Sequence, residues 1–191
     1  MRATTRAAEG IPRLRWTLEE FERLTELGVL SEDDRIELIG GELVPMSPKG
    51  NRHEVVRDEL QNWIMRRLPE TLRLSSEIGW RPPGAHTYVE PDLLICPMEF
   101  KGVTVAPPDV LLAIEVAQSS LRFDTTTKAR LYGALGVREY WVVNAKTLVT
   151  RVHREPIALG YKSVEDVAPD VALTPLLVPA LTIRLADLPI E

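Results

Sequence analysis

The hydrophobic positions near the start of the chain follow first a helical spacing and then a strand-like one. In the segment 15–28, leucine and phenylalanine recur every three residues, which predicts an amphipathic helix. Thr17 and Glu20 have the spacing of a capping box at its start. In the segment 35–46, short apolar runs flank Gly40-Gly41, which predicts two short strands joined by a tight turn.

A second helical pattern covers residues 47–68 and begins after Pro48. Its apolar stripe consists of Val56, Leu60, Trp63, Ile64 and Leu68. Three runs bounded by turn-forming residues follow, and they predict strands over 72–80, 88–96 and 110–117. The last two are almost continuously apolar, so we expect them to pair at the centre of a sheet.

A third helix is expected over 124–137, with Asp124 as its N-cap and Gly136 as its C-cap. Strands are then expected over 139–144 and 147–153. The C-terminal tail contains prolines, which interrupt any long element.

The order of these elements predicts an α/β fold with a mixed sheet. Three consecutive strands can form a meander, and the helix before residue 139 can act as a crossover that brings in a parallel strand. Helices cover the faces of this sheet, preceded by an N-terminal helix and a β-hairpin. We expect residues 17–191 to form one domain, because 191 residues suit a single core, and residues 1–16 to be disordered.

The composition is that of an ordinary globular protein, with 45% hydrophobic and 27% charged residues. The single cysteine, Cys96, excludes an internal disulfide and suits a reducing cytoplasm, where we expect the protein to reside. No apolar run approaches the roughly 20 residues of a membrane span. The net charge of −5 counts against a dedicated nucleic-acid binder, but not against an enzyme whose site is screened by metal ions.

Two carboxylates interrupt the most apolar strands. Asp92 lies in the run 88–97 and Glu115 in the run 109–117, and both are placed toward the C-terminal half of their strand. A buried carboxylate is costly to ionise without a partner, and neighbouring strands are about 4.8 Å apart. The two side chains are therefore expected to share a divalent cation, since carboxylate oxygens favour Mg²⁺ or Mn²⁺. The alternative is that each carboxylate caps a turn or pairs with an arginine.

Lys128 occupies the apolar face of the third helix, together with Leu131, Tyr132 and Leu135. A lysine on a core-facing stripe requires a nearby anion, unless its stem packs while its head reaches water. Gln118 and Ser119, which follow the strand of Glu115, are interpreted as loop residues.

These residues, in this order, resemble a known family. The resemblance rests on PD at 91–92, EV at 115–116, GVREYWVV at 136–143, and the side chains Asp124, Lys128 and Tyr132. Together they are similar to the Uma-type restriction endonucleases of the PD-(D/E)XK nuclease superfamily, over roughly residues 17–188. The resemblance implies a restriction-endonuclease-like fold.

The resemblance also implies roles for individual side chains. Asp92 and Glu115 would be metal ligands, and Lys128 would be the catalytic lysine. The superfamily pattern places its lysine two residues after the acid, where this chain has Ala117, so the charge would come from the helix instead.

Two further residues match family positions. The resemblance favours His53, at the start of the second helix, as a site residue, and it includes Glu37 of the predicted hairpin as a metal ligand. Each also has a simpler interpretation as a solvated residue. For Glu37 that interpretation is favoured by its position on the strand face opposite Ile36 and Leu38.

The resulting hypothesis is a metal-dependent endonuclease that uses Mg²⁺ or Mn²⁺ to hydrolyse phosphodiester bonds in nucleic acid, DNA being expected. The resemblance also makes a homodimer plausible. Five basic residues of the second helix and its flanks are candidate phosphate contacts or simply solvated: Lys49, Arg52, Arg57, Arg66 and Arg67.

Two other function classes stay open at this point. A nuclease-like binding or assembly module without catalysis is suggested by the acidic charge and by Ala117. A glycosidase with a carboxylate pair is disfavoured by the 6% aromatic content and leaves Lys128 without a role.

Overall fold

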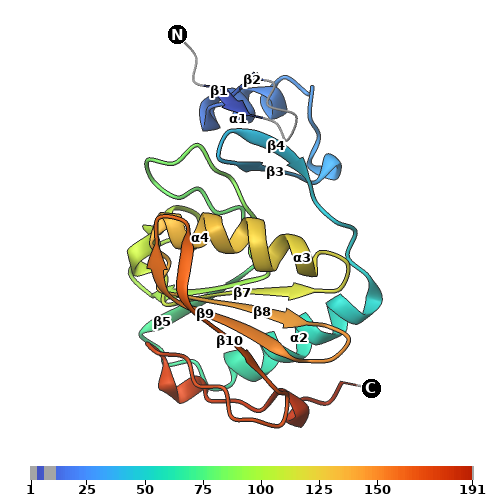
Figure 1. Ribbon diagram of the computed structural model, residues 1–191, viewed down its shortest axis with the longest axis vertical. Helices are drawn as coiled ribbons and strands as arrows, with labels where there is room; N and C mark the ends of the chain where they lie inside the picture. Colours follow the sequence, from blue (N-terminus) through green and yellow to red (C-terminus); the bar gives the residue numbers. More distant parts are fainter. Residues whose placement is uncertain (1–3, 7–11, 191) are drawn as a thin grey trace.

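The computed structural model describes residues 4–6 and 12–190 (Figure 1). Its helices are α1 Leu18–Glu26, α2 Asn51–Met65, α3 Leu121–Phe123 and α4 Ala129–Leu135, with a π-helical turn, η4 Asp124–Lys128, joining the last two. Its strands are β1 Thr4–Arg6, β2 Pro12–Leu14, β3 Ile36–Ile39, β4 Glu42–Pro45, β5 Leu72–Ser76, β6 Leu93–Pro97, β7 Leu112–Ala117, β8 Glu139–Asn144, β9 Thr150–Ile157 and β10 Gly160–Val167.

The main sheet has six strands in the order β10-β9-β8-β7-β6-β5. Strands β5, β6 and β7 form an antiparallel meander, and β8 runs parallel to β7 after the crossover through α3 and α4. Strands β9 and β10 complete the sheet with antiparallel pairs. The predicted mixed sheet, its meander and its crossover helix are therefore confirmed, as is the pairing of β6 with β7.

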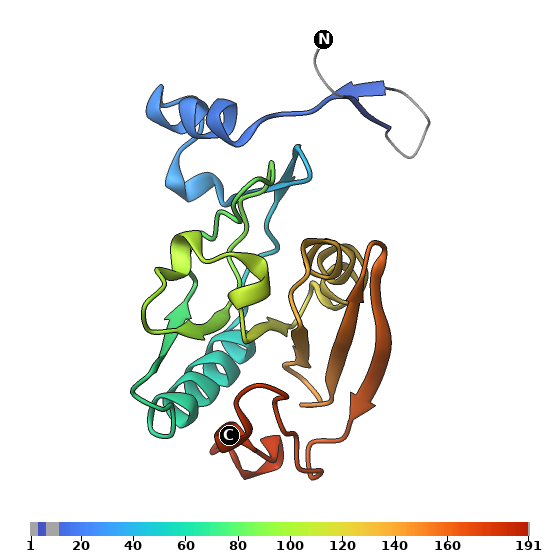
Figure 2. The ribbon, with the colours of Figure 1, turned by 90° about the vertical axis from the view of Figure 1, so that its left-hand side faces the viewer.

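Each face of the sheet carries its own hydrophobic core, because neighbouring residues of a strand point to opposite faces. On one face, Leu93 and Ile114 pack with the stripe of α2 and with the C-terminal segment. On the other face, Leu94 and Ala113 pack with α4 and with Trp80. Figure 1 and Figure 2 show α2 and the C-terminal segment on one side of the sheet and α4 on the other.

The hairpin β3–β4 sits above the α4 face. Gly40 and Gly41 have φ values of 56° and 87°, which allows the tight turn that their sequence predicts. Leu38 exchanges two backbone hydrogen bonds of 2.8 Å with Tyr88, so the hairpin is fixed to the chain segment that leads into β6. Helix α1 begins at the expected capping box of Thr17 and Glu20. The backbone hydrogen bonds between Leu38 and Tyr88 thus hold the hairpin beside the start of β6.

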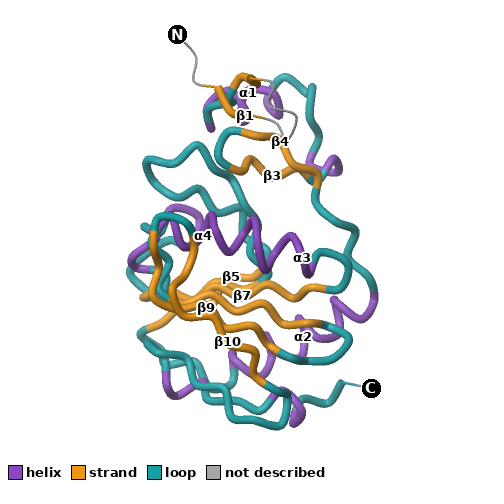
Figure 3. The backbone as a smooth tube through the Cα atoms, viewed as in Figure 1, coloured by secondary structure: helices purple, strands orange, loops and turns teal. Residues whose placement is uncertain are grey.

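The structure differs from the expected elements in several places. Residues 4–6 and 12–14 form paired strands where disorder was expected. Of the other residues that were expected to be disordered, 1–3 and 7–11 lie outside the described part of the chain. Strand β6 begins at Leu93 rather than at residue 88. Strand β9 extends from Thr150 to Ile157, and β10 was not expected. In Figure 3 these two strands form a long ribbon at the sheet edge, and the C-terminal segment is mostly loop.

The last helical region also begins earlier than expected. It starts at Leu121, so Asp124 is an interior residue of the helix and not its N-cap. Gly136 ends the helix with φ 90°, as predicted. None of the helices in residues 4–6 and 12–190 combines the length and the apolar character that crossing a membrane requires.

Candidate active site

The antiparallel pairing of β6 and β7 brings Asp92 opposite Glu115. Leu93 pairs with Ile114 and Leu94 with Ala113, so the next position in this register places Asp92 across from Glu115. Asp92 immediately precedes β6, whereas Glu115 lies near the end of β7. The expectation that both lie toward the C-terminal half of a strand is thus wrong for Asp92. They meet because the start of one antiparallel strand faces the end of the other.

The Asp92 carboxylate is held by three donors. Its Oδ2 accepts hydrogen bonds from the backbone N–H of Val116 at 2.7 Å and from Nε2 of His53 at 3.0 Å. The ammonium of Lys49 lies 3.6 Å from Oδ1. Burial raises the pKa of Asp92, but the hydrogen bond and charge of His53, the Val116 amide and Lys49 outweigh burial and hold the pKa below its usual value. Asp92 is therefore an anion that faces the site through Oδ1.

The Glu115 carboxylate faces the helix above the sheet. Its Oε1 accepts hydrogen bonds from Nζ of Lys128 at 2.9 Å and from the hydroxyl of Tyr132 at 3.1 Å. Burial raises the pKa of Glu115 well above its usual value; Lys128 opposes this, while Asp92, Asp124 and Glu37 add to it. The predicted proximity of Lys128 to Glu115 is confirmed, and its catalytic role stays a prediction.

Glu37 reaches the same lysine from the hairpin. Its Oε1 lies 2.9 Å from Nζ of Lys128 and accepts a hydrogen bond of 3.0 Å from the backbone N–H of Glu90. Only 2% of Glu37 is exposed, so its interpretation as a solvent-facing residue is wrong. Burial lowers the pKa of Lys128. The charges of Glu115, Glu37 and Asp124 outweigh burial and raise the pKa above its usual value. Lys128 is consequently a charged ammonium between carboxylates.

Asp124 adds a fourth buried carboxylate on the π-helical turn. Its Oδ2 accepts a hydrogen bond of 2.5 Å from the hydroxyl of Ser120. Burial, countered by Lys128 and Ser120 and reinforced by Asp92 and Glu37, raises the pKa of Asp124 to about 6. Asp124 was expected as an N-cap and as one of the residues that carry the resemblance, but not as a site residue. Its spacing of four residues from Lys128 is the sequence signal that could have placed both on one helix face.

His53 is positioned by the N-terminus of α2. Its backbone N–H donates to the side-chain oxygen of Gln118 at 2.9 Å. A Cβ at Gly50, the N-cap of α2, would lie 2.5 Å from the Gln118 amide, so a larger residue there would displace this amide. Gln118, interpreted from the sequence as a loop residue, thus fixes the start of α2 against the end of β7. His53 contacts Asp92 because of this arrangement.

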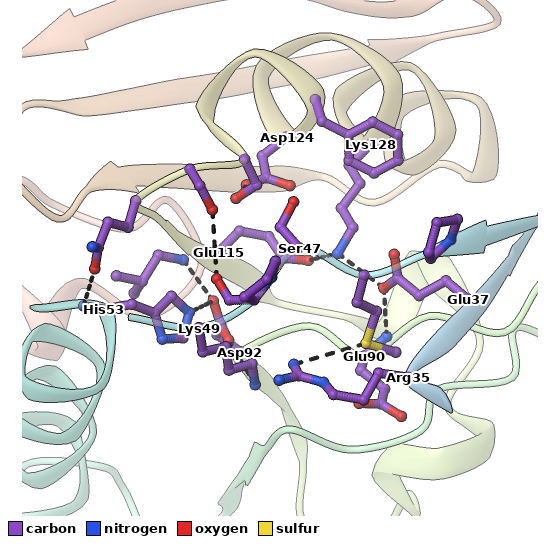
Figure 4. A pocket seen from close by; sticks show the side chains of 18 of the residues that line it. Arg35, Glu37, Ser47, Lys49, His53, Glu90, Asp92, Glu115, Asp124 and Lys128 are labelled. Atoms are coloured by element: carbon purple, nitrogen blue, oxygen red, sulfur yellow. Dashed lines mark hydrogen bonds and ion pairs between the residues drawn. The ribbon is translucent and has the colours of Figure 1, made fainter. Parts of the chain in front are cut away.

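These side chains line a cavity of about 180 Å³, which we call the site cavity (Figure 4). In Figure 4, Lys128 extends down from its helix, Glu37 approaches from the hairpin, and His53 and Lys49 lie on the opposite side. The buried charged or titratable residues that line it are Glu37, His53, Asp92, Glu115, Asp124 and Lys128. Four buried carboxylates thus face one buried ammonium, with Lys49 partly exposed beside them.

The donor set fits a hard divalent cation with few protein ligands. Within residues 4–6 and 12–190, no three histidine, cysteine or acidic side chains come together as a group that could hold a metal ion. Asp92 and Glu115 offer two facing carboxylates in a cavity with excess negative charge. Mg²⁺ keeps several waters and is commonly bound by one or two carboxylates together with substrate phosphates. The residues present match that mode of binding and not a complete protein cage.

Most of the basic residues expected near phosphates lie elsewhere. Of the five, only Lys49 lines the site cavity. Arg57 forms ion pairs with Glu54, Asp58 and Glu77. The guanidinium of Arg67 lies over its neighbour Trp63. Arg35, which no sequence pattern singled out, does line the cavity.

Comparison with known proteins identifies a family and a similar solved structure. The model of the family described as "Uma2: Putative restriction endonuclease" matches residues 18–187. A solved structure, described as a putative nuclease belonging to DUF820 from Anabaena variabilis, is similar with a TM-score of 0.65 and 16% sequence identity. The similarity covers 90% of this chain and 96% of that one, which shows a common fold. No curated protein matches the chain.

Proposed function

The chain belongs to the Uma2 family of restriction-type nucleases, and from this premise we propose that it is an endonuclease that requires a divalent cation and hydrolyses phosphodiester bonds in DNA. The observation that carries the proposal is the facing pair Asp92 and Glu115 with the Lys128 ammonium 2.9 Å from Glu115. Two carboxylates and a lysine are the parts that metal-assisted phosphodiester hydrolysis needs.

Asp92 and Glu115 are the residues that would hold the cation, Mg²⁺ or Mn²⁺. When bound, such a cation lowers the pKa of a water molecule and offsets the negative charge of the phosphate. Asp92 presents Oδ1, because Val116 and His53 occupy Oδ2. Lys49 lies 3.6 Å from that free oxygen and would shift as the cation binds. Glu37 pairs with Lys128, and we propose that it supports the lysine, in place of its expected role as a metal ligand.

Lys128 is the residue that would stabilise the charge that develops on the phosphoryl oxygens. Its ammonium is buried and held by Glu37 and Glu115, so it needs little reorganisation when the substrate arrives. Tyr132 keeps Glu115 in place through a hydrogen bond to Oε1, the oxygen that also accepts from Lys128. The second oxygen of Glu115 is then directed away from these two donors.

His53 would act on Asp92 and not on the substrate. The Nε2–H of His53 donates to Oδ2 of Asp92, and the start of α2 is fixed by Gln118. This bond orients the carboxylate and favours its charged form. His53 is accordingly a positioning residue in this proposal.

Incubation with nucleic acid tests the proposed function. Purified protein is mixed with supercoiled plasmid, or with RNA, in the presence of Mg²⁺, Mn²⁺ or EDTA, beside an Asp92→Ala variant. We expect nicked and linear plasmid with either cation, and no cleavage with EDTA or with Asp92→Ala. Cleavage of RNA alone would contradict DNA as the substrate, and equal cleavage by Asp92→Ala would exclude this site.

The competing function is a nuclease-like module that binds or assembles without catalysis. It is favoured by the absence of a lysine at position 117, where the chain has Ala117. Titration of the protein with Mg²⁺ or Mn²⁺ separates the two functions, because the module has no need to bind a cation. Cation binding that depends on Asp92, together with cleavage, supports the nuclease.

A further inference from the structure

Arg35 is the cation of the site cavity that lacks an acidic partner. Four cationic or potentially cationic side chains line the cavity, and three of them contact carboxylates: Lys49, His53 and Lys128. With the side chains that the structure describes, Arg35 forms no ion pair, and its guanidinium approaches Sδ of Met46 at 4.0 Å. A thioether is a weak acceptor, so most of the donors of this half-buried guanidinium are unused.

The backbone of Arg35 adopts a conformation that arginine rarely takes. Its φ is 47°, in the left-handed region that favours glycine. The carbonyl of Arg35 accepts a hydrogen bond of 2.8 Å from the backbone N–H of Met46. The next pair, Ile36 with Pro45, is the first pair of the hairpin ladder. The strained residue therefore sits at a fixed point at the base of β3 and β4. Glycine would suit this φ better than arginine does, and a residue held in such a conformation points to a role for its side chain.

The position of Arg35 connects the site cavity with a second cavity. That cavity, of about 620 Å³, is bordered by α1 and by Tyr88, and it shares Arg35 and Glu90 with the site cavity. In Figure 4 the guanidinium of Arg35 points toward the part of the cavity that holds Asp92. A ligand that leaves the carboxylates in the direction of α1 would pass this side chain.

We propose that Arg35 binds the phosphate next to the one that is cleaved, so that the nucleic-acid strand leaves the site cavity toward α1. This rests on the proposed nuclease function. A guanidinium matches two phosphate oxygens with two parallel N–H donors, which an ammonium cannot do. The carboxylates around it already have partners, so an incoming phosphate is the acceptor that this arginine can take without breaking an ion pair.

Three substitutions at Arg35 test the proposal with a short fluorescent oligonucleotide. Arg35→Met removes the charge, Arg35→Lys keeps the charge without the paired donors, and Arg35→Gly removes the side chain while relieving the positive φ. Binding is measured by anisotropy in Ca²⁺, between about 50 and 200 mM salt, and cleavage is measured in Mg²⁺ as separate kcat and KM values. The matched control is Arg138→Met, an exposed arginine just before β8, at the opposite end of the sheet.

We expect Arg35→Met to weaken binding roughly ten- to hundredfold, with a larger change in KM than in kcat. The slope of log affinity against log salt should fall by about one. Arg35→Lys should lie between Arg35→Met and the wild type. Arg35→Gly should bind as weakly as Arg35→Met yet melt at the wild-type temperature or above it, because glycine tolerates this φ. Arg138→Met should bind like the wild type.

Three results would overturn the proposal in distinguishable ways. If the wild type binds and cleaves the oligonucleotide and Arg35→Met has the same KM and the same salt slope, Arg35 does not bind phosphate and the nuclease function stands. A lower melting temperature of Arg35→Met with unchanged binding would likewise assign Arg35 a structural role. If the wild type neither binds nor cleaves the oligonucleotide, the proposed function fails, and the role of Arg35 fails with it.

Discussion

Two buried carboxylates on neighbouring parallel strands have opposite surroundings. Glu139, the first residue of β8, accepts hydrogen bonds from the Trp141 indole at 2.9 Å, from Arg154 at 2.7 and 2.9 Å and from the backbone N–H of Leu176 at 2.6 Å. This group, the Glu139 cluster, joins the sheet to the C-terminal segment with one anion balanced by one arginine. Near the end of β7, Glu115 instead shares a single buried ammonium with Glu37.

The difference shows how one sheet uses the same residue types for two purposes. Glu139 points to the face that carries α2 and the C-terminal segment, and both of its carboxylate oxygens accept hydrogen bonds. Glu115 points to the face of α4, where four buried carboxylates line a cavity. A balanced, hydrogen-bonded pair stabilises the fold, whereas an excess of one charge beside a cavity needs a ligand of the opposite charge.

The largest effect is expected from a substitution that breaks the Glu139 cluster. Glu139→Gln leaves Arg154 charged without its partner, and the loss of one member of a buried pair costs about 3–5 kcal/mol of unfolding free energy. For a chain of this length the melting temperature should fall by roughly 10 °C or more. Thermal unfolding measures this, and cleavage per folded molecule should stay at the wild-type value. Lost cleavage with an unchanged melting temperature would assign Glu139 to the active site.

The next effect concerns Lys128. Lys128→Met should keep the fold and much of the cation binding, yet reduce phosphodiester cleavage on the order of a hundredfold or more, because it removes an electrostatic stabiliser of the transition state. Single-turnover cleavage of a plasmid measures the loss. Lys146→Met, at an exposed lysine of the β8–β9 turn, is the matched control and should cleave normally. A Lys128→Met protein that cleaves at the wild-type rate would leave this lysine with a structural role only.

A smaller effect is expected from the pH dependence of stability. It concerns the carboxylates of the site cavity, because Asp124 has a raised pKa. Burial raises the pKa of Asp124 to about 6, so between pH 4 and 6 the folded state keeps a proton that the unfolded state has released. Stability without a divalent cation should therefore fall as pH rises through this range, by up to about 3 kcal/mol. Urea unfolding in EDTA measures the slope. Asp124→Asn should reduce this slope without abolishing it, because burial also raises the pKa of Glu115, and an equal slope in that variant would show that Asp124 does not contribute.

The smallest effect is stabilisation by the cation itself. At a Mg²⁺ concentration ten times its dissociation constant, unfolding should cost about 1.4 kcal/mol more, which raises the melting temperature by a few degrees. Asp92→Asn should abolish this shift. Glu139→Gln should keep it despite its lower starting temperature, because its site cavity is intact. A Mg²⁺ shift that survives in Asp92→Asn would place the cation elsewhere.

Sequence patterns predicted the parts of the fold that depend on local spacing. The capping box of α1, the Gly40-Gly41 turn and the paired apolar strands β6 and β7 are present as expected. Strand β10 was missed because its sequence, GYKSVEDV, is mostly polar, as suits an exposed edge of the sheet. A polar edge strand has little hydrophobic signal of its own, and its partner β9 determines its structure.

Sequence reasoning predicted which residues line the site cavity better than it predicted how these residues are arranged. Asp92, Glu115 and Lys128 lie together because the order of their elements and the pairing of the two strands were predicted correctly. The burial of Glu37 depends on the pairing of its neighbour Leu38 with Tyr88, 50 residues beyond Leu38, which alternation within a strand cannot reveal. Asp124 was misassigned because the helix begins at Leu121, and its π-helical turn has no local sequence signature.

The antiparallel order of β6 and β7 also has a use for protein engineering. Asp92 and Glu115 lie where β6 starts and β7 ends, so the connection between the strands, residues 98–111, joins them at the other end. Over the length of these strands that is on the order of 15 Å from the carboxylates. Exposed Glu99 and Lys101 in this connection are therefore suitable points for attaching a fluorophore or inserting an epitope. A label there would lie away from the carboxylates of the site cavity.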